Sequence, residues 1–284
     1  MVIEFKNVSK TFPDGTHAVR DFNLVLPSRK TTVFVGSSGC GKTTLLRMIN
    51  RMVEPTAGSI EIDGEDISTR SAVALRRSIG YVMQNSGLLP HLTVEDNIAT
   101  VPVLQGAKKR DARTRARELM HTVGLDESMA RRYPNQLSGG QQQRVGVARG
   151  LAADPNILLM DEPFGAVDPI VRTELQQELI RLQDEVDKTI VFVTHDIDEA
   201  FLLGDQVVIL EVGAQKAQVG SPSEIIESPA TDFVATFIGA DRGKRALHLK
   251  ETPTGTVVVD SEGRTQGAII DKPTETHQAD GGAG

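Results

Sequence analysis

The sequence has few of the cysteines, metal-ligand clusters and long apolar runs that characterise disulfide-bonded, metal-stabilised or membrane-spanning proteins. It has one cysteine and no tryptophan, and aromatic residues make up 4% of its 284 residues. The single cysteine, Cys40, excludes an intramolecular disulfide, and no cluster of cysteine and histidine has metal-ligand spacing. The longest apolar runs, such as residues 157–160, fall far short of the ~20 residues of a membrane helix, and the N-terminus lacks the basic and apolar regions of a secretory signal. We therefore expect a soluble, cytosolic protein without a structural metal site.

An excess of positive charge is also absent. The chain has 31 Lys and Arg against 38 Asp and Glu, a net charge of −7. Proteins that wrap nucleic acid non-specifically are usually basic, so we expect no nucleic-acid partner. With 39% hydrophobic and 24% charged residues the composition is globular, and the length suits one large domain or two ordinary ones.

Strand-like and helix-like segments alternate along the chain. β-branched or alternating runs predict strands at 2–8, 18–26, 31–35, 79–83, 157–160, 189–194 and 206–210, and Asp63-Gly64 predicts a hairpin turn within 59–64. Helical patterns cover 42–52, 108–123, 140–152, 170–186 and 196–203, and the segment from 93 to 96 looks like a helix cap. The alternation implies a parallel sheet covered on both faces and interrupted by a mostly helical insert at about 93–151.

A glycine-rich turn at 36–44 carries the strongest chemical signal. It fits the pattern G-x-x-x-x-G-K-[ST] at every fixed position and lies between a predicted strand and a predicted helix, which argues against a chance match. Glycines let the backbone curl so that successive N–H groups form a concave anion site at a helix N-terminus. Lys42 adds a positive charge for the β- and γ-phosphates, and Thr43 offers a hydroxyl to Mg²⁺. The predicted phosphate-binding residues are Gly36, Ser37, Ser38, Gly39, Cys40, Gly41, Lys42, Thr43 and Thr44.

Two adjacent carboxylates end the apolar strand at 157–160. Asp161 can hold Mg²⁺ through its water shell, and Glu162 can orient or deprotonate an attacking water. Such a pair also ends ordinary strands, but here it follows a phosphate-binding loop in the same chain. We therefore expect Asp161 and Glu162 to belong to a nucleotide-hydrolysing site.

A Ser-Gly-Gly turn that opens the predicted helix at 140 makes a second anion site, with a hydroxyl and free N–H groups. The run from 137 to 145, Leu-Ser-Gly-Gly-Gln-Gln-Gln-Arg-Val, is the signature of ATP-binding cassette (ABC) ATPases, and the sequence resembles that family over nearly its whole length. The resemblance implies an α/β fold: a P-loop NTPase (RecA-like) parallel-sheet core with an N-terminal antiparallel β-subdomain and a helical ABC subdomain. It also implies an ATPase that uses Mg²⁺.

The resemblance assigns further positions. Gln84 matches the Q-loop, which contacts Mg²⁺ or the attacking water, and His195 matches the residue that contacts the γ-phosphate. Asp168 matches the D-loop, where Val167 replaces the commoner Leu, and Phe12 falls where an aromatic ring stacks on adenine; a core phenylalanine is the alternative. The expected catalytic residues are Glu162, His195 and Gln84, and the expected Mg²⁺ ligands, partly through water, are Thr43, Gln84 and Asp161.

In this family the two anion sites of one chain do not face each other. The resemblance therefore implies that the signature residues of one copy cover the nucleotide held by Lys42 of another copy. ATP would then hold a head-to-tail dimer together, and hydrolysis would release it. The signature residues expected at the nucleotide are Ser138, Gly139, Gly140 and Gln141.

Three further stretches, 84–91, 97–102 and 238–247, are similar to cassettes of quaternary-amine importers, which take up glycine betaine, carnitine, choline or proline. The implied partners are a second copy or a paired cassette, transmembrane permease subunits and, indirectly, an extracytoplasmic substrate-binding protein. The implied location is the cytoplasmic face of the membrane, as a peripheral subunit. If these stretches are instead common to importer cassettes, they do not identify the substrate, and the alternative is an importer ATPase for another substrate class, such as an amino acid, a sulfonate or a sugar.

The alternative functions from other classes are those of ABC ATPases that do not drive transport. DNA-repair and chromosome ATPases carry long coiled coils or zinc modules, which one cysteine and the lack of sustained heptads argue against. A translation-type protein would have two phosphate loops, and the chain has one. A non-catalytic regulator is disfavoured because Glu162 and His195 are both present.

The resemblance places the nucleotide-binding domain at 1–240, with a core at about 1–86 and 154–240 and a helical subdomain at about 87–153. The remaining tail, 241–284, holds a strand and turn from 256 to 264 that look like a fragment of one CBS repeat. The tail is too short for a tandem CBS pair, so sensing of ionic strength through such a pair is not expected. The polar end from 271 to 284 is expected to be disordered.

Overall fold

The computed structural model describes residues 1–84, 86–165, 169–185, 188–239, 248–252, 255–259 and 263–268. The chain divides into two compact units, Met1–Thr231 and Asp232–Gly284. No helix in the described parts of the chain is both long and apolar enough to cross a membrane.

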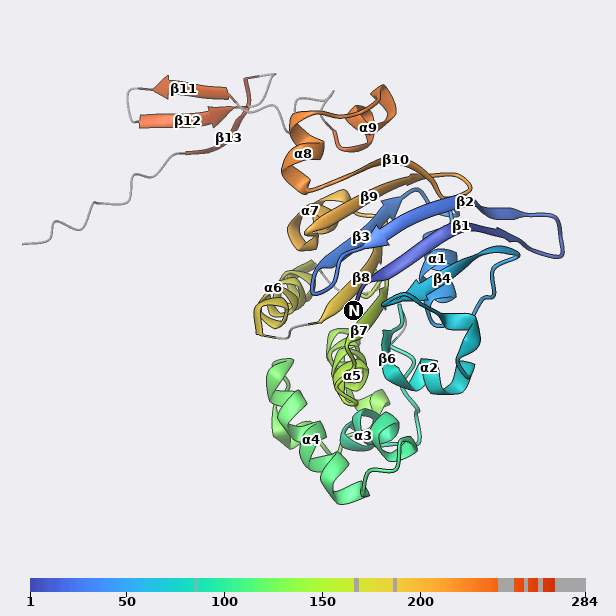
Figure 1. The fold of residues 1–284 in the computed structure, drawn as a ribbon. Helices are drawn as coiled ribbons and strands as arrows, with labels where there is room; N and C mark the ends of the chain where they lie inside the picture. Colours follow the sequence, from blue (N-terminus) through green and yellow to red (C-terminus); the bar gives the residue numbers. More distant parts are fainter. Residues whose placement is uncertain are drawn as a thin grey trace, which may run out of the picture. The chain divides into compact units, whose positions relative to one another are not determined.

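A six-stranded sheet forms the centre of the first unit, in the order β10-β9-β3-β8-β7-β6 (Figure 1). Its strands are β3 (Thr31–Gly36), β6 (Ile79–Val82), β7 (Ile157–Asp161), β8 (Thr189–Thr194), β9 (Gln206–Glu211) and β10 (Gln215–Gly220). All neighbours pair in parallel except β10, which runs antiparallel to β9. Every residue of β3, β7 and β8 is buried, which explains their unbroken apolar and β-branched runs. The predicted parallel sheet is confirmed.

A second, antiparallel sheet lies at the N-terminal side, in the order β2-β1-β4-β5. Its strands are β1 (Ile3–Thr11), β2 (His17–Leu26), β4 (Ala57–Ile62) and β5 (Glu65–Asp66). Asp63 and Gly64, which join β4 to β5, both have positive φ, 51° and 80°, as an Asp-Gly hairpin turn requires. Phe22 joins the two sheets: its ring lies 5.2 Å from that of Phe5 and 6.1 Å from that of Phe34, perpendicular to both.

Helices cover both faces of the central sheet. Figure 1 shows α1 (Lys42–Ile49) on one side of the sheet and α6 (Pro169–Glu185) and α7 (Ile197–Leu203) on the other. The predicted helix at 42–52 was too long: it ends at Ile49 because the Asn50 side chain accepts a hydrogen bond from the Met52 N–H, 3.1 Å, and Arg51 adopts a φ of 56°. Two short helices, α2 (Ala72–Ser78) and α8 (Pro222–Glu227), were not predicted.

The predicted helical insert lies between β6 and β7. It consists of α3 (Val94–Leu104), α4 (Lys109–Thr122) and α5 (Gly139–Leu151), which lie together in Figure 1. The predicted cap of α3 is present, because the Thr93 side chain accepts a hydrogen bond from the Asp96 N–H and the first turn is acidic. α3 packs on both α4 and α5, and α5 packs on β6. The helical insert is thus tied to the edge of the central sheet.

The second unit contains α9 (Asp232–Phe237) and a three-stranded antiparallel sheet, β11-β12-β13. The strands are β11 (His248–Thr252), β12 (Gly255–Val259) and β13 (Thr265–Ala268). The strand predicted from residue 256 corresponds to β12, and β11 and β13 were not predicted. The segment from 271 to 284 lies outside the described residues.

Candidate active site

The glycine-rich loop connects β3 to α1 as predicted, and its neighbours explain two of its glycines. A Cβ at Gly36 would collide with the backbone oxygen of Leu210 in β9, and one at Gly41 with that of Ala18 in β2. Gly41 also has a φ of 112°, which favours glycine, at the start of α1. The loop is therefore seated between the two sheets and has no room for larger residues at these positions.

Lys42 lies across this loop and is almost completely buried. Its ammonium nitrogen donates hydrogen bonds to the backbone oxygens of Gly36, 2.8 Å, and Ser37, 2.9 Å, and lies 3.9 Å from the Cys40 sulfur. The partners that the structure gives this cation are neutral, so an anion in the loop would supply its counter-charge. The geometry suits a phosphate group.

Asp161 ends β7 beside the first turn of α1 and is 5% exposed. Its Oδ1 accepts a hydrogen bond from the Thr43 hydroxyl, 2.8 Å, and its Oδ2 accepts one from the Tyr81 hydroxyl, 3.1 Å. Arg47 of α1 pairs with the same Oδ2 at 3.3 Å. A hydroxyl and a carboxylate oxygen that already meet are the hard oxygen ligands that Mg²⁺ prefers, so the residues present fit this ion.

Arg47 and Tyr81 were not singled out from the sequence. Arg47 follows Thr43 by one helical turn, so the spacing on α1 is a signal that could have found it. Tyr81 reaches the site only because β6 pairs with β7, which places it opposite Leu159. Burial raises the pKa of Tyr81 to about 12, so its hydroxyl keeps its proton and donates to Asp161 at neutral pH.

Glu162, Gln84 and His195 meet at the carboxyl ends of three neighbouring strands, β7, β6 and β8. The Glu162 Oε2 accepts a hydrogen bond from Gln84 Nε2 at 3.3 Å and lies 3.3 Å from His195 Nδ1. Glu162 has a φ of 44°, an unfavourable value for a residue with a side chain, and its N–H is held by the Val193 carbonyl at 3.0 Å. The structure thus brings together all three residues that were predicted to be catalytic.

The signature residues open α5, and Ser138 is exposed at its start. Ser138 and Gln141 form a reciprocal capping box: the Ser138 hydroxyl accepts from the Gln141 N–H at 3.2 Å, and Gln141 Oε1 accepts from the Ser138 N–H at 3.0 Å. Gly139 and Gly140 are the first two residues of the helix. These contacts are local to α5, so the structure does not join the signature to the phosphate loop of the same chain.

Phe12 begins the turn between β1 and β2 and is half-buried. Its N–H donates to the Thr16 carbonyl at 2.9 Å, and Lys10 lies 5.3 Å from the centre of its ring. The ring is therefore part of a surface turn rather than of the fully buried core. Asp168 and Val167 lie outside the described residues.

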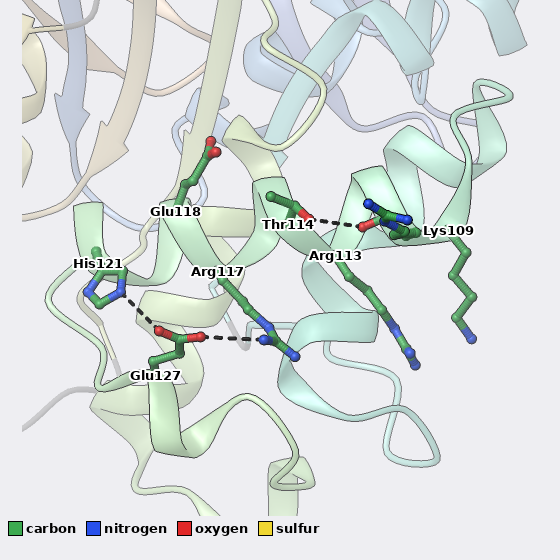
Figure 2. Close-up of a pocket in the computed structure, with 8 residues that line it drawn as sticks. Lys109, Arg113, Thr114, Arg117, Glu118, His121 and Glu127 are labelled. Atoms are coloured by element: carbon green, nitrogen blue, oxygen red, sulfur yellow. Dashed lines mark hydrogen bonds and ion pairs between the residues drawn. The ribbon is translucent and has the colours of Figure 1, made fainter.

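A separate hollow of about 670 Å³ lies on the helical insert (Figure 2). The predicted site residues that the structure describes do not line it; its lining is Lys109, Arg110, Arg113, Thr114, Arg117, Glu118, His121 and Glu127. Figure 2 shows Arg117 and His121 both reaching Glu127, at 3.4 and 3.5 Å. Arg113 forms a two-pronged pair with Asp96 of α3, at 2.9 and 2.8 Å. These ion pairs join α4 to its neighbours, so the hollow's charges are largely compensated within the chain.

A strand, a glycine-rich loop and a helix with a strand-end carboxylate beside them define a P-loop nucleotide-binding domain. The family model described as ABC transporter matches residues 19–165. Choline transport ATP-binding protein OpuBA of Bacillus subtilis is 52% identical over 241 residues, which are 85% of this chain and 63% of that protein. The glycine betaine uptake system ATP-binding protein YehX of Escherichia coli is 49% identical over 88% of this chain and 80% of that protein. The chain belongs to the ABC transporter family, as its sequence motifs indicated.

The solved structures agree with this assignment. The dimeric structure of MJ0796, a bacterial ABC transporter cassette, matches with a TM-score of 0.71 and 35% identity, over 78% of this chain and 98% of that one. The predicted fold class is confirmed. The chain spans 60–63% of the length of the first curated relatives that it matches.

Proposed function

We propose that the chain hydrolyses ATP and thereby powers an ABC importer of the quaternary-amine class, which takes up the osmoprotectants glycine betaine, carnitine, choline or proline. The observation that carries the proposal is the convergence of two groups at one sheet edge. Lys42, Thr43 and Asp161 suit a magnesium-bound triphosphate, and the contacts of Glu162 with Gln84 and His195 suit attack by water. The substrate class is supported by the relatives, which are named for choline, carnitine and glycine betaine transport.

Binding of ATP follows from the loop and its surroundings. The N–H groups from Gly36 to Thr44 and the Lys42 ammonium would hold the β- and γ-phosphates, and Phe12 would stack on the adenine. Thr43, Asp161 and Gln84 would hold Mg²⁺, partly through water. When bound, this ion would neutralise phosphate charge.

In the proposed reaction Glu162 accepts a proton from water while the water oxygen attacks the γ-phosphorus. The bond between that phosphorus and the oxygen of the departing ADP breaks, and inorganic phosphate forms. Gln84 orients the Glu162 carboxylate and the water, and His195 donates a hydrogen bond to the γ-phosphate. Because Glu162 already contacts both partners, little rearrangement is needed to reach this geometry.

The proposed working state is a head-to-tail dimer of two copies or of this chain with a paired cassette. Ser138, Gly139, Gly140 and Gln141 of one copy would cover the nucleotide of the other, together with Asp168. The exposure of Ser138 and its local capping contacts support this, since the turn can accept a second partner. A dimer is also the form in which a related protein, the ATP-binding cassette MJ0796, was solved in a post-hydrolysis state bound to ADP and Pi.

The remaining partners are permease subunits in the membrane and, through them, an extracytoplasmic substrate-binding protein. The chain would lie at the cytoplasmic face as a peripheral subunit. The proposed organisation is a nucleotide-binding domain over 1–240, with its core at 1–86 and 154–240 and a helical subdomain at 87–153, followed by a CBS-like tail over 241–284.

Reconstitution tests the proposal as a whole. The chain is placed in liposomes with the permease and binding protein encoded nearest to it, and ATP hydrolysis is measured with each candidate amine supplied outside. Stimulation by one of the quaternary amines or proline is expected. Stimulation only by an amino acid other than proline, a sulfonate or a sugar would reject the substrate class, and an absence of hydrolysis in every condition would reject the ATPase.

A further inference from the structure

The backbone on both sides of Gln84 is held by side chains of one helix, α5. Gln143 Nε2 donates to the Met83 carbonyl at 3.3 Å. Arg149 donates through Nη2 to the Ser86 carbonyl at 2.5 Å and through Nη1 to the Gly87 carbonyl at 2.7 Å. The fork of one guanidinium therefore bridges two successive carbonyl groups just beyond Gln84.

The contacts of Gln143 with Met83 and of Arg149 with Ser86 are partly buried, and the contact of Arg149 with Gly87 is exposed. Gln143 is 2% exposed and Ser86 is 7% exposed. Burial lowers the pKa of Arg149, whose partners here are neutral carbonyl oxygens. A partly desolvated guanidinium is left unsatisfied when its acceptors move away, and this costs free energy, so the fork favours one arrangement of the loop.

The loop itself is in an arrangement that needs such support. Ser86 has a φ of 39° and Gly87 a φ of 56°, and the left-handed conformation is unfavourable for serine. A Cβ at Gly146 of α5 would lie 3.5 Å from the Ser86 carbonyl oxygen, so the loop packs directly on this helix. Contacts from α5 thus help to hold the left-handed conformation of Ser86.

We infer that Arg149 is a positioning residue that sets the place of Gln84 relative to Glu162, with Gln143 as its weaker partner. The inference rests on the proposed ATP hydrolysis. α5 begins with Gly139 beside Ser138 and carries Gln143 and Arg149 further along, so one rigid helix links the signature turn to the Gln84 segment. A movement of either end is thereby transmitted to the contact between Gln84 and Glu162.

A double-mutant cycle in the full chain tests this role. Arg149→Met should lower kcat for ATP about 10-fold, the cost of a displaced positioning group, and leave KM within about 2-fold. Gln84→Ala should lower kcat by a similar factor, and the double variant should lose no more than Gln84→Ala alone, because Arg149 acts through Gln84.

Arg149→Lys keeps the charge but not the planar fork, so it should recover only part of kcat. Arg113→Met, in the ion pairs of α4, is the matched control that destabilises the helical insert without reaching the Gln84 segment.

Two kinetic results would overturn the inference: unchanged kcat in Arg149→Met, or losses that multiply in the double variant. Should Arg149→Met fail to fold, Gln143→Leu replaces it in the same cycle. Amide hydrogen exchange in the nucleotide-free chain separates this inference from the proposed function. Exchange at Gln84, Ser86 and Gly87 should be faster in Arg149→Met or Arg149→Lys than in the parent, and equal exchange rejects the positioning role whether or not the chain hydrolyses ATP.

Discussion

At the scale of single residues, Glu162 combines an unfavourable backbone conformation with contacts to two other predicted catalytic side chains. Its φ of 44° turns the carboxylate toward Gln84 and His195, and the Val193 carbonyl holds the backbone in that position. Strain that is maintained by the surrounding fold often marks a residue whose side chain must point in one direction. Glu162 is therefore the residue whose change is most informative.

Replacing Glu162 with Gln should leave ATP binding intact and slow turnover roughly 100-fold or more, a loss of ~3 kcal/mol of transition-state stabilisation. An amide retains the shape and the contact with Gln84 but cannot accept the proton of the attacking water. Single-turnover hydrolysis and equilibrium nucleotide titration measure the two quantities separately. Parental turnover in this variant would contradict the role of Glu162.

Glu199 of α7 gives a pH dependence of stability. It is 6% exposed and accepts a hydrogen bond from the Thr194 hydroxyl at 2.6 Å. Burial raises its pKa above the ordinary 4.5, Asp196 acts in the same direction, and Thr194, Arg172 and His195 oppose the shift. Because the folded state holds the proton more tightly, the stability that this group contributes is complete below 4.5 and declines as the pH rises through the raised pKa.

Glu199→Gln removes this titration. We therefore expect the free energy of unfolding of the parent to fall relative to that of Glu199→Gln as the pH is raised from about 4.5 toward neutrality. Urea denaturation at several pH values measures the difference. A difference between the two proteins that stays constant across this range would be inconsistent with a raised pKa.

At the scale of elements, the ion pairs between α3 and α4 hold the helical insert together. Arg113, through its hydrogen bonds, holds the pKa of Asp96 below its usual 3.8. The stability from Asp96 is thus present above the ordinary pKa and is lost as the pH falls through the lowered one. Asp96→Asn should cost about 1 kcal/mol at neutral pH and progressively less in acid, measured by chemical denaturation.

Arg110 lines the same hollow on the helical insert as Arg113, and Arg110→Met is the control for this measurement. Its unfolding free energy should stay within ~0.5 kcal/mol of the parent, as for an ordinary surface substitution. An equal loss of unfolding free energy in both variants would show that the pairing of Asp96 with Arg113 does not stabilise the fold more than an ordinary surface residue does.

The elements that carry motifs were predictable, and the polar edge elements were not. Continuous apolar and β-branched runs predict β3, β7 and β8, and every residue of these strands is buried. By contrast, β10 (Gln215–Gly220) has no buried residue, and the buried residue of α2 is Leu75. With so little burial, neither shows the periodicity that a prediction needs. The P-loop and signature residues follow from local spacing, but Tyr81 and Arg149 reach their partners only through strand order and helix packing, which the local sequence does not encode.

At the scale of the whole molecule, the chain contains two turns that are predicted to bind anions, and their described contacts do not join them. The phosphate loop lies between the two sheets, and the signature turn makes its contacts within the start of α5. Two copies arranged head to tail would complete two nucleotide sites at once. ATP would favour that dimer and ADP would not, since the γ-phosphate is the group that both copies share.

Sedimentation of the full-length Glu162→Gln variant with Mg²⁺ and saturating ATP tests this claim most directly. The variant should sediment as a dimer with ATP and as a monomer with ADP, and Lys42→Ala, which lacks the cation of the loop, should stay monomeric with either nucleotide. If the Glu162→Gln chain binds ATP yet sediments as a single subunit, even with the partner permease present, two chains do not share the nucleotide and the account is wrong.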